Sequence, residues 1–150
     1  MSKSEFFTTR VWVNKTKAEV FDFFSDLNNL VLLTPPLMNM NIDESFLADK
    51  VKKDTSFQIK IGYRPLVLKW QSEITDWNPS DHFADMQTTG PYSKWIHKHS
   101  FVEDDGGTWV VDEIEYIPKL FPTLGKYFYK LLLKSMFSYR DKQLKKLLYN

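Results

Sequence analysis

Residues 83–116 determine the expected fold, and they read FADMQTTGPYSKWIHKHSFVEDDGGTWVVDEIEY. This stretch predicts three successive strands, with turns at Gly90-Pro91 and Asp105-Gly106. Asp105-Gly106 is a strong signal for a two-residue hairpin, because both central positions of that turn require positive φ. If these two residues form the turn, Asp104 faces Gly107, and the pairing continues residue by residue along both strands.

This register places polar residues on the inward face of the sheet. Side chains alternate between the two faces of a strand, so one face collects four cross-strand pairs: Phe101 with Val110, His99 with Asp112, His97 with Ile114, and Trp95 with Tyr116. The other face carries Lys98 across from Glu113. An ion pair on one face and aromatic residues on the other are typical of a half-buried antiparallel sheet.

The preceding hairpin extends the same inward face. A loop at residues 78–81 would pair Trp77 with His82, and the ladder would continue with Ile74–Asp85, Ser72–Gln87 and Trp70–Thr89. A three-residue connection after Gly90 would then bring Asp85 beside His99 and Gln87 beside His97. The predicted inward polar set is Asp85, Gln87, His97, His99 and Asp112.

Composition narrows the class of protein. With 150 residues, 43% of them hydrophobic and 16% aromatic, we expect one domain over residues 1–150 with a large core or a lined cavity. A net charge of +1 offers no field to attract nucleic acid. The absence of cysteine excludes disulfides and thiol chemistry. Residues 1–5 lack the apolar run of a secretion signal, and no segment is long and apolar enough to insert stably into a membrane, so we expect a cytoplasmic protein.

The rest of the chain surrounds this sheet with helices. Residues 5–13 alternate as a strand does, and Thr16 and Glu19 form a capping box that begins a short helix. A second short helix should end before Pro35-Pro36. Strands are expected near 38–47, 54–62 and 66–77, with a turn at Tyr63-Arg64. Residues 122–147 then predict a long helix with one broad stripe, formed by Leu124, Phe128, Leu131, Leu132, Ser135, Met136, Tyr139, Gln143 and Leu147.

This order predicts an α+β helix-grip fold, in which a curved antiparallel sheet of about seven strands wraps around a long C-terminal helix. The sequence also resembles the SRPBCC ligand-binding superfamily, which includes START domains and the birch-pollen-allergen type, and within it a bacterial subfamily of unassigned activity. The resemblance rests on segments throughout the chain: Leu33 to Leu37 (LTPPL), Trp70 to Ile74, Phe83 to Gln87, Gly90-Pro91-Tyr92, Trp95 to Phe101 (WIHKHSF), Gly107-Thr108 and Asp112 to Tyr116. It implies a cavity between sheet and helix that binds a small apolar molecule, and no particular reaction.

The inward polar set has four interpretations. Buried histidines among aromatic side chains usually make structural hydrogen bonds, and a His99–Asp112 pair would satisfy both partners. The same groups could recognise a ligand at the wall of an apolar cavity. Asp112 could instead orient His99 as the base of a cyclase or hydrolase. Finally, His97 and His99 with Asp85 or Asp112 could bind a metal, although neighbouring aromatic residues would crowd the ion.

We therefore predict a binding protein rather than an enzyme, with neither a metal nor a cofactor. Its ligand would be a small hydrophobic or amphipathic, lipid-like molecule. Catalysis by His99 and Asp112, and an interaction module with a filled core, are the alternatives. Both a monomer and a homodimer fit the sequence. The expected ligand-binding residues are Trp70, Ile74, Gln87, Trp95, His97, His99, Phe101, Asp112, Tyr116, Phe128, Leu132 and Met136, with Phe57, Ile59 and Leu68 as further wall residues.

Overall fold

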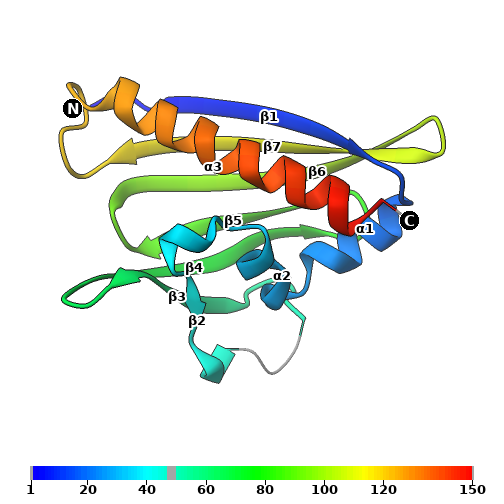
Figure 1. The fold of residues 1–150 in the computed structure, drawn as a ribbon, viewed down its shortest axis with the longest axis horizontal. Coiled ribbons are helices and arrows are strands. Elements are labelled where there is room, and N and C mark those ends of the chain that lie inside the picture. Colours follow the sequence, from blue (N-terminus) through cyan, green and yellow to red (C-terminus); the bar gives the residue numbers. More distant parts are fainter. Residues whose placement is uncertain (1, 47–49, 150) are drawn as a thin grey trace.

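One curved antiparallel sheet forms the body of the molecule (Figure 1). The computed structural model describes residues 2–46 and 50–149. The seven strands lie in the order β1-β7-β6-β5-β4-β3-β2. Their bounds are β1 Glu5–Val13, β2 Asn41–Ile42, β3 Ser56–Tyr63, β4 Leu66–Asn78, β5 His82–Thr89, β6 Tyr92–Asp104 and β7 Gly107–Pro118.

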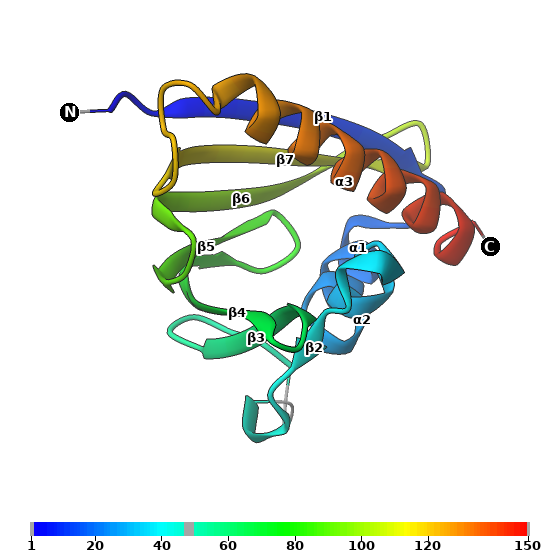
Figure 2. The same ribbon diagram turned by 60° about the vertical axis from the view of Figure 1, so that its left-hand side comes forward.

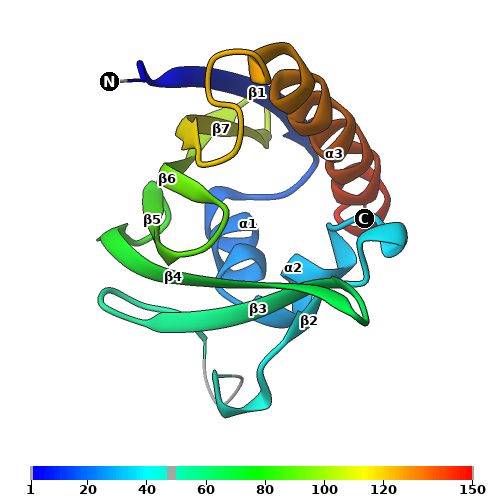
Figure 3. The same cartoon turned by 90° about the vertical axis from the view of Figure 1, so that its left-hand side faces the viewer.

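The helices close the concave side of this sheet. The short helices α1 (Lys17–Phe24) and α2 (Leu27–Leu32) follow β1, and the 22-residue α3 (Lys126–Leu147) ends the chain. Figure 3 shows the sheet curling around α1 and α2, with α3 across its open side; Figure 2 shows the same arrangement obliquely. The predicted helix-grip fold is confirmed. Thr16 caps α1 with the predicted capping box.

The β6–β7 hairpin follows the predicted register. Asp104 pairs with Gly107, His99 with Asp112, and Lys98 with Glu113. Asp105 and Gly106 have φ values of 48° and 76°, as the turn requires. Burial alternates along both strands, so this register turns His97, His99 and Asp112 inward.

The two neighbouring ladders, β4–β5 and β5–β6, both depart from prediction. Between β4 and β5, the pairs Ile74–Asp85 and Ser72–Gln87 are present, but a bulge beyond Ile74 pairs Trp77 with Phe83 instead of His82, and a second irregularity pairs Thr89 with Gln71 instead of Trp70. Between β5 and β6, Asp85 pairs with His97 and Phe83 pairs with His99, so the predicted Asp85–His99 and Gln87–His97 pairs are wrong.

The side chain of Gln87 explains the changed register between β5 and β6. The β5–β6 pairing ends at Met86–Ile96. Beyond it, Gln87 Nε2 donates to the Tyr92 carbonyl at 2.7 Å, and the Tyr92 amide donates to Gln87 Oε1 at 3.2 Å. The Gln87 side chain thus forms the hydrogen bonds that further backbone pairing would have made, and the connection is shorter than predicted.

The β2 region is less regular than the predicted strand at 38–47. It contains a two-residue strand between the 3-10 helices η1 (Pro36–Met38) and η2 (Glu44–Phe46). Residue 47 of the predicted strand lies outside the described residues. The β3–β4 turn is one residue later than predicted, with Tyr63 paired to Leu66. The predicted face is kept, because Ile59 pairs with Trp70 and Ile61 with Leu68.

The apolar stripe predicted for α3 is wrong as the buried face of the helix, although two of its members, Leu132 and Met136, line the cavity described below. The helix buries Leu133, Phe137, Arg140 and Leu144, whereas Leu124, Phe128, Leu131 and Leu147 of the predicted stripe are exposed. The helix carries apolar residues on two adjacent faces. Because the buried face includes an arginine, the pattern of apolar residues in the sequence predicted that the other face would be buried. In the described part of the chain, no helix is both long and apolar enough to span a membrane.

Candidate functional site

A cavity of about 290 Å³ lies between the concave sheet face, α2 and α3. Its walls are mainly apolar and aromatic. They include Leu27, Leu30, Leu33, Phe57, Ile59, Leu68, Trp70, Ile74, Phe83, Tyr92, Trp95, Leu132, Leu133, Met136 and Phe137. Its charged or titratable wall residues are Asp26, Asp85, Tyr92, His97, His99, Tyr129 and Arg140. Four of these converge at one place, where β5, β6 and α3 meet.

Asp112, in the adjacent strand β7, lies behind the two cavity histidines and is 1% exposed. Its Oδ1 atom is 2.8 Å from His97 Nε2 and forms a hydrogen bond with it. The same oxygen is 2.9 Å from His99 Nδ1. The predicted contact between His99 and Asp112 is therefore present, but His99 Nδ1 is not aligned for a hydrogen bond with the carboxylate. One carboxylate oxygen therefore positions both imidazoles, although the sequence had paired it with His99 alone.

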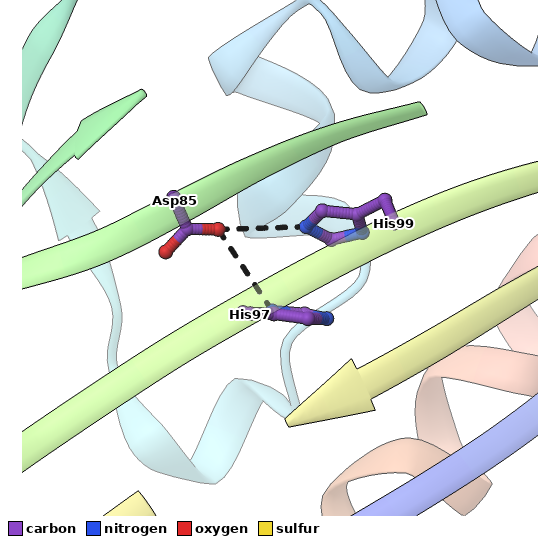
Figure 4. Close-up of side chains that lie close together, drawn as sticks. All are labelled: Asp85, His97 and His99. Carbon is purple, nitrogen blue, oxygen red and sulfur yellow. Dashed lines mark ion pairs between the residues drawn. The ribbon is translucent and has the colours of Figure 1, made fainter. Parts of the chain in front are cut away.

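Asp85 faces both imidazole rings from the adjacent strand β5 (Figure 4), at the ring nitrogens that do not contact Asp112. Its Oδ2 atom is 3.5 Å from His99 Nε2 and 3.9 Å from His97 Nδ1. The two rings lie side by side, with centroids 3.8 Å apart. Each histidine thus directs one nitrogen towards Asp112 and the other towards Asp85 at the cavity wall.

Arg140, on α3, brings a buried cation to the same end of the cavity. Its guanidinium group packs against the rings of Phe24 and Phe137, and Nη2 is 3.9 Å from Asp112 Oδ1. Arg140 Nε has no hydrogen-bond partner among the described residues, although the residue is only 8% exposed. A buried guanidinium with a free donor is costly unless an acceptor reaches it.

Burial and charge set the protonation of these groups. Burial and the neighbouring His99 lower the pKa of His97, against the opposing effect of Asp112. Burial also acts to lower the pKa of His99, but contacts with Asp112 and Asp85 outweigh it, and the net shift is upward. For Asp112, burial acts to raise the pKa, but Arg140 and both histidines hold it well below its usual range. The site therefore combines an ionised buried carboxylate with two unlike imidazoles.

The predicted site residues fall into two groups. Trp70, Ile74, Trp95, His97, His99, Leu132 and Met136 line the cavity. The remaining five do not lie among its wall residues in the described chain: Gln87, Phe101, Asp112, Tyr116 and Phe128. Phe101 and Tyr116 are buried in the core, and Phe128 is 64% exposed on the outer face of α3. The Gln87 side chain forms a hydrogen bond with the Tyr92 carbonyl, at the connection between β5 and β6.

Sequence reasoning missed two contributions to the site. Arg140 had a detectable signal, because it occupies one position in the regular spacing Leu133, Phe137, Arg140 and Leu144. The apolar residues of α2 and η1 also line the cavity, but their sequence reveals only a short helix before a proline pair. Their placement depends on how the sheet curves.

Comparisons with known proteins agree with this architecture. No family model and no curated protein matches the chain. Among solved structures, a Chromobacterium violaceum protein, CV1439, is similar with a TM-score of 0.77 and 12% identity, covering 97% of both chains. The Zhui aromatase/cyclase from Streptomyces sp. R1128 has a TM-score of 0.73 and 13% identity, over 95% of this chain and 92% of that one. Ara h 8.0201 has a TM-score of 0.64 and 14% identity, over 96% and 99%.

These similarities establish the fold class. The chain has the same helix-grip fold as these neighbours, which is the fold that its sequence resemblance implied. At identities of 12% to 14% the neighbours carry the architecture and not the residues of a site.

Proposed function

We propose that the protein binds a small, mainly apolar molecule carrying an acidic or otherwise hydrogen-bond-accepting oxygen group. One observation carries this proposal: the wall of the apolar cavity contains a buried arginine, Arg140, whose ion-pair contact with Asp112 is long, at 3.9 Å. An apolar pocket with a few convergent polar groups is the usual form of a small-molecule site. The volume of about 290 Å³ lies at the lower limit of such sites, which favours a compact ligand.

The polar end would fix the orientation of the ligand. An oxygen of the ligand would accept a hydrogen bond from the Arg140 guanidinium where that group lines the cavity, and hydrogen bonds to a charged donor are stronger than those between neutral groups. The apolar body would then extend along Trp70 and Leu132. The fold supports this proposal, because its concave sheet and covering helix enclose the volume that the ligand needs.

A cyclase or hydrolase would use the same residues differently. His97 has a lowered pKa and directs Nδ1 towards Asp85 and the cavity, which suits a neutral base. A neighbouring fold member is an aromatase/cyclase. Catalysis further requires a substrate bond within reach of that nitrogen, whereas binding requires only the volume and the polar end, so binding is the function proposed.

A matched pair of substitutions on α3 tests the cavity. Leu132 lines it, whereas the adjacent Leu131 is 67% exposed on the outer face. The probe is 1-anilinonaphthalene-8-sulfonate, an aromatic molecule with one anionic group. We expect Leu132→Trp to fill the cavity and weaken saturable probe binding at least tenfold, with Leu131→Trp unchanged. Equal binding by the wild type and Leu132→Trp would overturn the proposal, because the probe would then occupy the exposed apolar surface.

A further inference from the structure

We propose that Asp85, His97 and His99 form a binding site for a divalent transition-metal ion of the zinc, cobalt or iron(II) type. Their three potential ligand atoms lie within 4.8 Å of one another, and all three residues line the cavity. This inference departs from the sequence-based expectation of no metal, and it does not depend on the apolar ligand proposed above.

The spacing of the three ligand atoms suits an ion better than direct contact. A hydrogen bond between a protonated imidazole and a carboxylate is about 2.7–2.9 Å long. Asp85 Oδ2 is instead 3.5 Å from His99 Nε2 and 3.9 Å from His97 Nδ1. Two ligands on a tetrahedral ion, each about 2.0–2.1 Å from it, lie about 3.4 Å apart. The Asp85–His99 distance already matches this value, and small side-chain rotations would bring His97 into range.

Asp112 supplies the outer support that metal-binding histidines usually have. Such histidines donate their other ring N–H to a carboxylate, which fixes the tautomer and the ring orientation. Asp112 Oδ1 forms a hydrogen bond with His97 Nε2, and it lies 2.9 Å from His99 Nδ1, which a rotation of the ring would bring into line. In the neutral rings, protons on these two nitrogens leave the lone pairs of His97 Nδ1 and His99 Nε2 free. Both free nitrogens lie on the Asp85 side (Figure 4).

Charge and access are compatible with an ion at this place. With both imidazoles neutral, the carboxylates of Asp85 and Asp112 outnumber the single guanidinium of Arg140, and a cation would relieve this excess of negative charge. Two imidazoles and one carboxylate suit a borderline transition metal, whereas magnesium and calcium prefer oxygen ligands. The aromatic residues expected to crowd an ion flank the site, while the ligand atoms themselves open onto the cavity. A bound ion would keep a coordination position facing that cavity.

Titration of the chelator-treated protein with metal alone tests this site. We expect isothermal titration with ZnCl₂ to show one site per chain, and CoCl₂ to give the visible absorption of a low-coordinate site. Asp85→Asn and His99→Gln should each lower zinc affinity at least tenfold and remove the cobalt spectrum. Asp112→Asn should lower affinity by about 10–100-fold, as loss of outer-shell partners does.

His82 provides the matched control, since it is the one histidine of the sequence outside the proposed site and is paired with Asp76 at the surface. His82→Gln should bind zinc and cobalt as the wild type does. Circular dichroism would establish that each variant is folded, and zinc should raise the unfolding temperature of every variant that binds it. The proposal is overturned if the wild type shows no stoichiometric zinc site, if MgCl₂ binds equally well, or if His82→Gln loses as much affinity as His99→Gln.

Discussion

Two histidine–aspartate contacts of similar length lie in this sheet in opposite surroundings. His82 Nε2 is 3.0 Å from Asp76 Oδ2, with side-chain exposures of 27% and 54%. His97 Nε2 is 2.8 Å from Asp112 Oδ1, with exposures of 8% and 1%. The surface contact involves two residues in water, whereas the buried one belongs to a network that includes His99, Asp85 and Arg140. Contact distance therefore does not define a site; burial and the number of coupled partners do.

The largest expected effect comes from removing the carboxylate at each contact. Asp112→Ala removes the buried carboxylate that forms a hydrogen bond with His97 and lies close to His99 and Arg140. Breaking a buried charged pair costs about 3–5 kcal/mol of unfolding free energy. Asp76→Ala should cost about 0–1 kcal/mol, because an exposed pair contributes little. Urea unfolding at pH 7 measures both, and equal losses would show that the buried network is not special.

Asp141 reports how far the charge of the buried network reaches. Burial raises the pKa of this carboxyl group to about 6, and the negative charge of Asp112 adds to the rise. The folded-state pKa thus exceeds the unfolded value of about 3.9. The folded protein then binds more protons between these values, so this group's contribution to stability is present below about pH 4 and is lost as pH rises through about 6.

Asp141→Asn should remove that loss. Its urea midpoint, relative to the wild type, should therefore be higher at pH 7 than at pH 4.5. If the difference in urea midpoint between the wild type and Asp141→Asn is the same at both pH values, burial and Asp112 do not influence this carboxyl group as described.

The smallest expected effect lies on the outer face of the same hairpin. Lys98 and Glu113 are cross-strand neighbours there, one residue along each strand from His99 and Asp112. Replacing both with Thr should change the unfolding free energy by about 0–1 kcal/mol, and Thr is well accepted in strands. A loss as large as that of Asp112→Ala in the same urea assay would mean that the two faces of the hairpin do not differ as described.

The β6–β7 hairpin could be predicted residue by residue because local chemistry decides it. Asp105-Gly106 fixes the turn, and a period of two then fixes which residues share a face. The same logic placed His99 against Asp112 correctly. It could not foresee that the Asp112 carboxylate also reaches His97, which is paired with Ile114 in the ladder. Side-chain direction across a curved sheet depends on tertiary packing.

Longer-range features were less predictable for a related reason. The hydrogen bonds between the Gln87 side chain and the Tyr92 backbone accompany the observed β5–β6 register, and rules for turn length do not predict such side-chain contacts. The face that α3 buries depends on which of two apolar stripes fits the sheet. Arg140 is tolerated on the buried face because Phe24, Phe137 and Asp112 surround it. Phe137 lies on α3 itself, but Phe24 belongs to α1 and Asp112 to β7, both far away in the sequence.

The most direct test of the central claim compares two probes at Arg140. The anion 1-anilinonaphthalene-8-sulfonate and the uncharged N-phenyl-1-naphthylamine share an aromatic body and differ in the sulfonate group. A hydrogen bond to a charged group contributes about 1.5–3 kcal/mol, or roughly tenfold or more in affinity. We predict that Arg140→Met weakens binding of the anionic probe by at least that factor and leaves the uncharged probe unchanged. Equal weakening of both probes, or of neither, would contradict a cavity whose buried arginine recognises an oxygen group.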